Sequence, residues 1–307
     1  MTNDMTVEAQ ILYLRKRGQF VDDYLTFYRQ ILMFQAGQKS KINKEKLAIF
    51  GKTSDIESRL QMGLPLLEKN NLYIEAEVAR SSFIELLSIF EKYPQQYPPD
   101  KIAILRGALH KNDLLPNEFI QTFIAENKDY FSQLSEAIAI EPGVLIFIAK
   151  TISLPILETY ADLLQSYLAE KDKIWLRPFC PLCGNVVAMA RLEKEVGQRH
   201  LWCTTCHTEW AFSRNQCPYC SNEDQSRIRY FYDENDSLYR VYVCDQCKRY
   251  LKTIDENKFA FIQPINMTLE DLITHYLDEI AVKEGYQSML WWDGIEKYDH
   301  QELPVGH

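Results

Sequence analysis

The sequence has little positive charge, and this limits the partners that it favours. Its 307 residues include 34 Lys and Arg against 43 Asp and Glu, which gives a formal net charge of −9. A surface of this sign does not favour DNA, RNA or the anionic face of a membrane. Hydrophobic residues make up 46% of the chain. The length and composition therefore permit one large domain or two to three smaller ones with a sizeable core.

A targeting segment and a long apolar run are also lacking. The first twenty residues contain neither the hydrophobic stretch nor the small-residue cleavage site of a signal peptide. The most apolar stretch, Gly143 to Leu157, is interrupted by Lys150 and Pro155. We expect it to be too short and too polar to span a bilayer core of about 30 Å. These absences predict a soluble, cytoplasmic protein without membrane insertion.

Cysteine is absent from most of the chain, because all eight cysteines lie between residues 180 and 247. A secreted disulfide scaffold would spread its cysteines over the loops that it must link. Here they form four CxxC motifs, namely Cys180 and Cys183, Cys203 and Cys206, Cys217 and Cys220, and Cys244 and Cys247. This clustering indicates metal binding in a reducing compartment.

The spacing of the motifs suggests how they pair. A CxxC turn directs two thiolates at one point, and two turns supply the tetrahedral set that zinc or iron accepts. The intervals after Cys183 (19 residues) and Cys220 (23 residues) each suit a hairpin, whereas only ten residues follow Cys206 before the next motif. The CPLC and CPYC motifs also open two similar units. The predicted sites are Cys180, Cys183, Cys203 and Cys206, and Cys217, Cys220, Cys244 and Cys247. The alternatives are an inner site from the two middle motifs and an interleaved cross-brace.

Other interpretations of the cysteine segment are weaker. CPYC alone matches a glutaredoxin-type redox pair, but that role requires the start of a helix in a βαβ unit. His200 and His207 adjoin the motifs, yet eight cysteines are available, so we expect both histidines at the surface or behind the ligands. Gly184 follows the first motif, and the other three motifs lack the glycine that often closes such a turn. This lack bears on the detailed turn geometry and not on the number of ligands.

A ribbon of roughly forty residues has too little core to fold alone. We expect Trp202, Trp210 and Phe212 to form a small apolar core beside the metal. Structural zinc contributes about 10–16 kcal/mol of apparent binding free energy in small peptides, which exceeds what these aromatics provide. The metal is therefore expected to hold this segment together.

Helical patterns fill the chain from about residue 5 to residue 172. Leu64–Leu67 and Tyr73–Phe90 are expected to be helical, and Pro98-Pro99 and Pro116 are placed to begin helices. Apolar residues at helical spacing form a stripe early in this region, at Val21, Tyr24, Leu25, Tyr28, Ile31 and Leu32. A helix-bundle core explains such stripes, and we find no arrangement of Ser, His and Asp that indicates catalysis.

Short alternating runs follow the helical region. Arg199–Trp202, Arg227–Tyr232 and Tyr239–Val243 favour strands. After about residue 258 a helix is expected, with Thr268 as its N-cap and Gly285 at its C-terminal end. The fold class is therefore α+β. The expected domains are a helical domain (1–172), two tandem rubredoxin-like or zinc-ribbon modules (173–215 and 216–258), and a C-terminal helix and tail with no clear period around Trp291, Trp292 and Pro304 (259–307).

Three runs resemble those of the formate dehydrogenase accessory protein family, FdhE. They are RPFCPLCGNVVAMA, RHLWCTTCHTEWAFSRNQCPYC and CDQCKRYLKTID. LEDLITHYLDEIAVKEGY is similar to the closing helix of the family, and DDYLTFYRQILMFQAGQ fits an early helix more loosely. The resemblance covers most of the chain and is specific from Arg177 to Tyr286. The chain departs from the family at Val186-Val187, where a Pro-Val pair is expected, and in its divergent helical domain, which bears on partner choice.

The resemblance implies a maturation factor, or assembly chaperone, needed for active formate dehydrogenase. It implies binding to the catalytic subunit in the cytoplasm before export. It also implies two metal ions per chain, each bound by four cysteines, with rubredoxin-type iron favoured and zinc as the other choice. The resemblance extends to Arg199, Glu209, Trp210 and Arg214 near the cysteines, and to no substrate-binding residue.

The residues alone leave three function classes open. These are a non-enzymatic assembly chaperone, a zinc-ribbon protein that binds nucleic acid, and a redox or electron-transfer protein that uses rubredoxin-type iron. Between Arg177 and Asp255 eleven Arg and Lys balance ten Asp and Glu. A duplex binder is expected to show a basic stripe, so this balance disfavours the second class.

Overall fold

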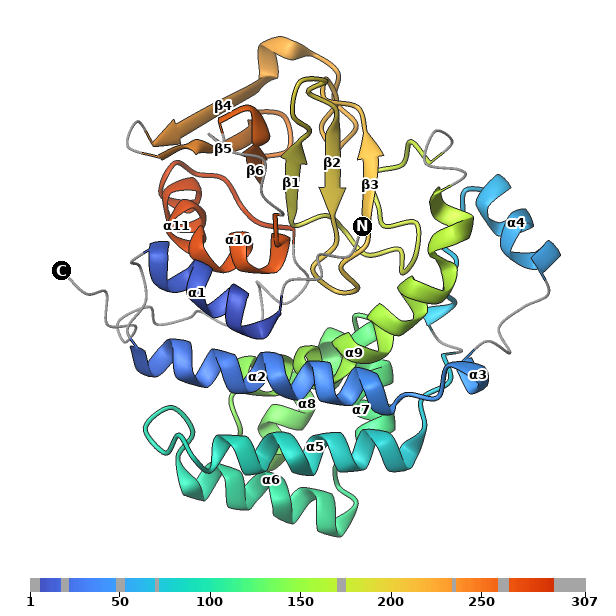
Figure 1. The fold of residues 1–307 in the computed structure, drawn as a ribbon, viewed down its shortest axis with the longest axis vertical. Helices are drawn as coiled ribbons and strands as arrows, with labels where there is room; N and C mark the ends of the chain where they lie inside the picture. The colour runs from blue at the N-terminus through green and yellow to red at the C-terminus, as the bar shows by residue number, and fades with distance from the viewer. Residues whose placement is uncertain are drawn as a thin grey trace. The chain divides into compact units, whose positions relative to one another are not determined.

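Helices fill the first half of the chain, and strands with two short helices follow (Figure 1). The computed structural model describes residues 6–17, 22–47, 53–69, 72–169, 175–233, 236–258 and 265–289. The chain divides into two compact units. Among the described residues, the helical unit lies within Thr6–Ile49 and Glu68–Tyr160, and the cysteine unit lies within Phe50–Leu67 and Ala161–Leu290.

The helical unit has a core of aromatic and aliphatic side chains. Phe83, Phe90 and Phe119 are completely buried, and Phe27 lies against Phe90 with ring centroids 6.2 Å apart. The helices of this unit are α1 (Val7–Arg17), α2 (Asp22–Lys41), α3 (Lys44–Leu47), α5 (Ala76–Phe90), α6 (Pro99–Lys111), α7 (Pro116–Ile124), α8 (Lys128–Ile138) and the greater part of α9 (Pro142–Ala169). The predicted helical region is confirmed.

Proline and glycine set several helix boundaries. Helix α6 begins at Pro99 and α7 at Pro116, as predicted, because a proline in the first turn loses no intrahelical hydrogen bond. The prediction of a helix over Leu64–Leu67 is wrong. Helix α4 (Thr53–Gln61) ends before Gly63, which adopts a left-handed φ of 69°, and Pro65 has no N–H to continue a helix.

Helix α9 corrects the expectation for the most apolar stretch. Its segment Pro142–Leu164 is long and apolar enough to cross a membrane by length and composition, although Lys150 and Pro155 lie within it. In the structure 72% of the most apolar window is buried inside the protein. The hydrophobic side chains of α9 therefore serve as core.

The strands form one mixed sheet, six-stranded within the described residues, in the order β3-β2-β1-β6-β5-β4. The strands are β1 (Met189–Leu192), β2 (Arg199–Trp202), β3 (Glu209–Phe212), β4 (Ile228–Asp233), β5 (Asp236–Cys244) and β6 (Arg249–Asp255). Strands β1 to β3 pair antiparallel, as do β4 to β6. Parallel pairing of β1 with β6 joins the halves, with Met189 opposite Lys252. The two predicted ribbons thus share one sheet.

Two short helices, α10 (Met267–Ile273) and α11 (His275–Lys283), follow the sheet. Buried Lys252 on β6 holds them through its Nζ, which lies 2.8 Å from a carboxylate oxygen of Asp271 and 2.8 Å from one of Asp278. This places a buried ion pair between strand and helices.

The predicted capping of the last helical segment is corrected in part. Asn266 is the N-cap in place of Thr268, because its side-chain oxygen accepts hydrogen bonds from the N–H groups of Thr268 (3.1 Å) and Leu269 (3.2 Å). Gly285 lies just after α11 with a left-handed φ of 87°, which agrees with the predicted helix end. The expected irregular tail around Trp291, Trp292 and Pro304 lies outside the described residues.

Candidate metal centres

The cysteine sulfur atoms form two groups in the described part of the chain. Within each group the Sγ atoms all lie within 4.8 Å of one another. The first group contains Cys180, Cys183, Cys203 and Cys206, and the second contains Cys217, Cys220, Cys244 and Cys247. The structure therefore brings together the two sets that the spacing predicts, and not an inner or interleaved arrangement.

The sulfur separations test whether the groups fit a metal ion. In the second group, Sγ of Cys217 lies 3.8 Å from that of Cys247, and Sγ of Cys220 lies 3.7 Å from that of Cys244. A tetrahedron with Zn–S bonds of about 2.3 Å has edges of about 3.8 Å. The corresponding separations in the first group are 3.4 and 3.5 Å. Both donor sets fit a tetrahedral ion, and four thiolates suit zinc and iron alike.

All four CxxC turns have the same backbone geometry. The residue directly after each motif has a left-handed φ between 57° and 74°, and its N–H donates to the carbonyl of the first cysteine over 2.8–3.0 Å. These residues are Gly184, His207, Ser221 and Lys248. The absence of glycine at three positions does not change the turn, which corrects the doubt raised by the sequence.

Exchanging residues at two of these positions is expected to shift stability in opposite directions. Ser221 is exposed and carries a Cβ in the left-handed region, which costs roughly 1–2 kcal/mol. Ser221→Gly removes this strain but loses some backbone entropy, so we expect a gain of about 0.5 kcal/mol. Gly184→Ala introduces the same strain, and we expect a loss of about 1 kcal/mol. Thermal unfolding of the metal-loaded variants measures both changes, and shifts of the same sign would contradict this account.

The two groups differ in exposure. The four cysteines of the first group have 0% relative exposure, whereas Cys220 and Cys247 of the second group are half-buried. Burial raises the pKa of the Cys183 and Cys206 thiols, and it raises the pKa of Cys217 to about 11. Metal binding must then displace protons from these thiols, so affinity falls as the pH is lowered.

A segment distant in sequence supports the first group. The backbone N–H of Leu66 donates to the carbonyl of Pro181 over 2.9 Å, and that of Leu67 donates to Leu182 over 2.8 Å. Both acceptors lie inside the CPLC motif. The two turns of the group are also linked, because the side-chain amide of Asn185 donates to the Thr205 hydroxyl over 2.8 Å. The local sequence around Leu66 gives no signal of this role.

Loss of one of these backbone donors is expected to weaken the first centre. Leu67→Pro removes the N–H and leaves the buried Leu182 carbonyl without this partner, at a cost of about 3 kcal/mol including backbone strain. Leu67→Ala removes the same buried side chain but keeps the N–H, so it is the matched control. We expect the proline variant alone to retain metal poorly in the first group. Equal metal retention in the two variants would contradict this expectation.

The predicted aromatic core of the ribbon is confirmed. Trp202, Trp210 and Phe212 have relative exposures of 3%, 1% and 1%. The indole N–H of Trp210 donates to the carbonyl of Arg177 over 3.0 Å. These side chains pack in the half of the sheet that carries the first group.

The two histidines next to the motifs do not belong to either sulfur group. The His207 ring stacks on Trp202 with centroids 5.2 Å apart, and its Nε2 lies 3.4 Å from the Thr268 hydroxyl. His200 lies 3.4 Å from a carboxylate oxygen of Glu193. Both contacts agree with the expectation that these histidines lie beside the ligands and not among them.

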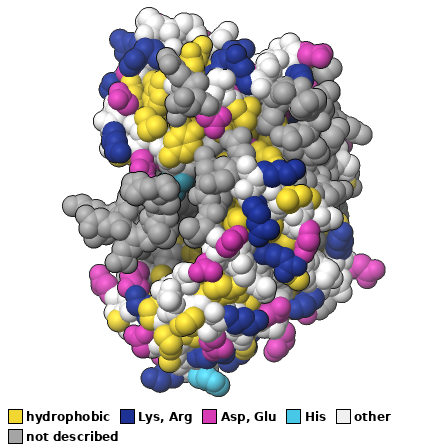
Figure 2. All heavy atoms as spheres, turned by 60° about the vertical axis from the view of Figure 1, so that its left-hand side comes forward, with side chains coloured by type: hydrophobic (Ala, Val, Ile, Leu, Met, Phe, Trp, Pro, Cys, Tyr) yellow, Lys and Arg dark blue, Asp and Glu magenta, His cyan; other side chains and the backbone are white. Residues whose placement is uncertain are grey.

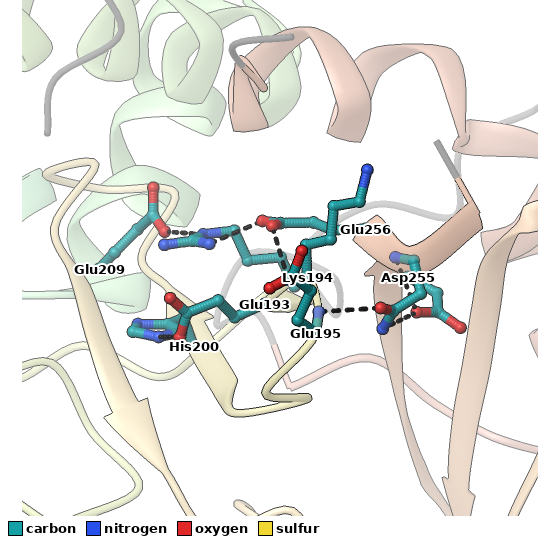
Figure 3. A network of polar contacts seen from close by, with 9 residues as sticks. Glu193, Lys194, Glu195, His200, Glu209, Asp255 and Glu256 are labelled. Atoms are coloured by element: carbon teal, nitrogen blue, oxygen red, sulfur yellow. Dashed lines mark hydrogen bonds and ion pairs between the residues drawn. The ribbon is translucent and has the colours of Figure 1, made fainter. Parts of the chain in front are cut away.

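A polar network crosses the junction of the two half-sheets (Figure 3). Arg191 on β1 donates to Glu209 on β3 over 2.5 Å and to Glu256 after β6 over 2.6 Å. Glu256 also accepts from the backbone N–H of Lys194 over 3.0 Å. Arg191 and the Lys194 N–H therefore link the two halves through Glu256, and Glu209, which the resemblance singles out, holds the Arg191 side chain in place.

The other singled-out residues have distinct environments. Arg199 is buried, with 1% exposure, and its Nη1 donates to the carbonyls of Ser213 (3.4 Å) and Gln216 (3.3 Å). Arg214 is exposed. At the departure from the family pattern, Val186 forms an isolated β-bridge with Phe179.

The chain is similar in sequence to FdhE proteins. A family model described as "FdhE, central domain" matches residues 179–214. The "Protein FdhE homolog" of Aquifex aeolicus is 26% identical over 280 residues, which is 90% of each chain. "Protein FdhE" of Escherichia coli is 32% identical over 113 residues, or 36% of this chain and 35% of that one.

A solved structure supports the same fold. The crystal structure of the FdhE protein from Pseudomonas aeruginosa matches 92% of each chain with a TM-score of 0.58 and 18% sequence identity. The match extends through both units, whereas the family model covers only the segment around the first group. The chain is therefore similar to FdhE proteins in sequence over 90% of its length, and it has the fold of the FdhE protein of known structure.

Proposed function

We propose that this protein is an accessory factor for the maturation of formate dehydrogenase, and that it binds the catalytic subunit in the cytoplasm as an assembly chaperone. The similarity to FdhE proteins supports this proposal, since the family model spans the first cysteine group and the Aquifex aeolicus homolog aligns over 90% of the chain. In this role the protein acts by binding and not as an enzyme. Each cysteine group holds one metal ion, with iron favoured by the resemblance and zinc as the other choice.

The burial of the first group supports a structural role for its metal. All four of its cysteines have 0% exposure, so a substrate has no access to the ion. The turns of this group flank short strands β1 to β3, which have four residues each. Such a small sheet depends on the metal for its stability.

An exposed face of the sheet is suited to hold a protein partner. Tyr230 and Tyr232 on β4 are 48% and 51% exposed, and Arg240 lies over the Tyr230 ring at 4.8 Å. Figure 2 shows hydrophobic side chains beside Lys and Arg side chains in the upper part of the molecule, where β4 lies in Figure 1. Tyrosine and arginine are enriched at the centres of protein interfaces. We place the contact with the catalytic subunit on this face.

Affinity capture from extract of a formate dehydrogenase-producing cell tests the proposal. We expect the full chain to recover the catalytic subunit of formate dehydrogenase. A double variant, Tyr230→Ala with Tyr232→Ala, is expected to recover at least tenfold less, as loss of two interface aromatics commonly costs more than about 1.4 kcal/mol. Tyr73→Ala changes a similarly exposed tyrosine in the helical unit and is the control. Recovery of nucleic acid without the subunit would overturn the assignment.

Electron transfer is a second candidate function, favoured by the half-buried Cys220 and Cys247 in the second group. An ion with exposed ligands exchanges electrons with a partner more readily than a buried one. Protein loaded with zinc in place of iron separates the two functions, because zinc has no redox chemistry. If zinc-loaded protein supports maturation as well as the iron form, the redox function is excluded and the chaperone function remains.

A further inference from the structure

The segment that follows α11, residues 286–288, is hydrogen-bonded to the second cysteine turn. The backbone N–H of Gln287 donates to the carbonyl of Lys248 over 2.9 Å, and the N–H of Tyr250 donates to the carbonyl of Gln287 over 3.4 Å. Gln287 thereby forms a parallel bridge with Arg249, the first residue of β6. Because Lys248 directly follows the CDQC motif, the segment is bonded to the residue that closes this turn.

The 286–288 segment also covers part of an edge of the sheet. Strand β1 pairs with β6 from Lys252 to Asp255, and β5 pairs along the opposite edge of β6. Gln287 therefore continues the line of β1 along the first residues of β6, in the same parallel direction. The Arg249 side chain adds a hydrogen bond from its Nη1 to the carbonyl of Ser288. The chain thus closes this stretch of β6 with its own backbone.

The Tyr286 side chain joins the segment to the CDQC turn itself. It is 5% exposed, and its hydroxyl donates to a carboxylate oxygen of Asp245 over 2.7 Å and accepts from Nη2 of Arg229 over 2.8 Å. Asp245 lies inside the motif and also accepts from Nε of Arg229 (2.8 Å) and Nζ of Lys248 (3.0 Å). The Lys248 ammonium lies 5.4 Å from the centroid of the Tyr286 ring. Side chains and backbone therefore hold the segment to the same turn.

These contacts require the CDQC turn in its metal-binding shape. In that shape the sulfur of Cys244 lies 3.7 Å from that of Cys220, and the sulfur of Cys247 lies 3.8 Å from that of Cys217. Thiolates at this distance repel one another without a cation between them, so loss of the ion favours separation of the two turns. Separation displaces the Asp245 carboxylate and the backbone that closes the turn, which are the partners of the 286–288 segment.

We propose that metal binding in the second cysteine group is coupled to attachment of residues 286–288. The bound ion holds the segment on β6, and loss of the ion releases it. Coupling between two binding events is reciprocal, so the attached segment raises the affinity of the second group for its ion by the same factor. The segment thereby makes the loading of the second group detectable at the surface of the protein. This coupling does not depend on the proposed maturation function.

Hydrogen exchange of the full chain tests the release of the segment. Cys247→Ser removes one ligand of the second group, and elemental analysis checks that the second ion is lost. In this variant we expect peptides that cover residues 284–289 to exchange about tenfold faster than in the zinc-loaded wild type, whereas peptides from β1 and β2 keep their protection. Unchanged exchange of residues 284–289 without the second ion would overturn the proposal. If β1 and β2 also lose protection, the affinity measurements on segment variants decide alone.

Variants of the segment test the reverse direction. Gln287→Pro removes the N–H that donates to Lys248, and Gln287→Ala keeps it and is the matched control, because the Gln287 side chain is exposed. In competition with a chelator, we expect the proline variant alone to bind zinc in the second group about tenfold more weakly, with the first group unchanged. Equal zinc affinity in the two variants would overturn the coupling. If Gln287→Pro does not fold, Tyr286→Phe decides, with Tyr73→Phe in the helical unit as its control.

Discussion

Cys203→Ser is expected to unfold the sheet of the cysteine unit while the helical unit stays folded. The variant removes one of four thiolates from a group with 0% exposure, so water cannot replace the lost ligand and three buried thiols remain. Structural zinc contributes about 10–16 kcal/mol in small peptides, more than the whole stability of most small domains. The purified variant should contain one metal ion fewer per chain by elemental analysis, if it retains the second ion at all.

Limited proteolysis localises the damage. We expect rapid cleavage between residues 175 and 255 and continued protection of the helical unit, whose core of Phe83, Phe90 and Phe119 contains no cysteine. Cys247→Ser is the matched comparison, because it alters a half-buried ligand of the other group and is expected to spare the first ion. If the segment from 175 to 255 resists protease in Cys203→Ser as it does in the wild type, the metal does not organise this unit.

The grouping of the cysteines could be predicted because the spacing of the motifs and the repeat of CPLC and CPYC both favour it. Intervals long enough for a hairpin separate Cys183 from Cys203 and Cys220 from Cys244, and the structure forms strands in both intervals. The backbone geometry of the turns was harder to predict, since a glycine follows only the first of the four CxxC motifs, at Gly184. At Ser221 and Lys248 the backbone hydrogen bond to the first cysteine of the motif accompanies a left-handed φ without glycine. The residue types at these two positions do not predict this backbone conformation.

Pairings between residues distant along the chain could not be predicted from this one sequence. The parallel pairing of β1 with β6 joins residues that are more than sixty positions apart, such as Met189 and Lys252. From the sequence, each of these strands is predicted to belong to a separate ribbon. The segment at Leu66 and Leu67 looked like another apolar helix, yet Gly63 and Pro65 end the helix and free its N–H groups for the first cysteine turn. Local sequence propensity predicted most of the helices and strands. Contacts between residues distant along the chain determined how these helices and strands pack together.

The second cysteine group is expected to lose its metal first when a chelator is added. Removal by a chelator requires it to approach the ion and displace thiolates one at a time. Cys220 and Cys247 are half-buried and offer such an approach, whereas the first group has none until the sheet opens. Local opening of a buried site costs much of the free energy of global unfolding. A difference of about 1.4 kcal/mol in the free energy of opening makes the rates of metal release from the two groups differ tenfold. We expect at least this difference.

Release of zinc from the fully loaded chain, followed with a metal-sensitive dye, should therefore show two phases of one ion each. Cys247→Ser should abolish the fast phase and leave the slow phase, which assigns the fast phase to the second group. Leu67→Pro should accelerate the slow phase only, because it removes a backbone hydrogen bond to the turn of Cys180 and Cys183. A single phase for both ions in the wild type would mean that the groups open together, and the difference in exposure would then have no bearing on metal exchange.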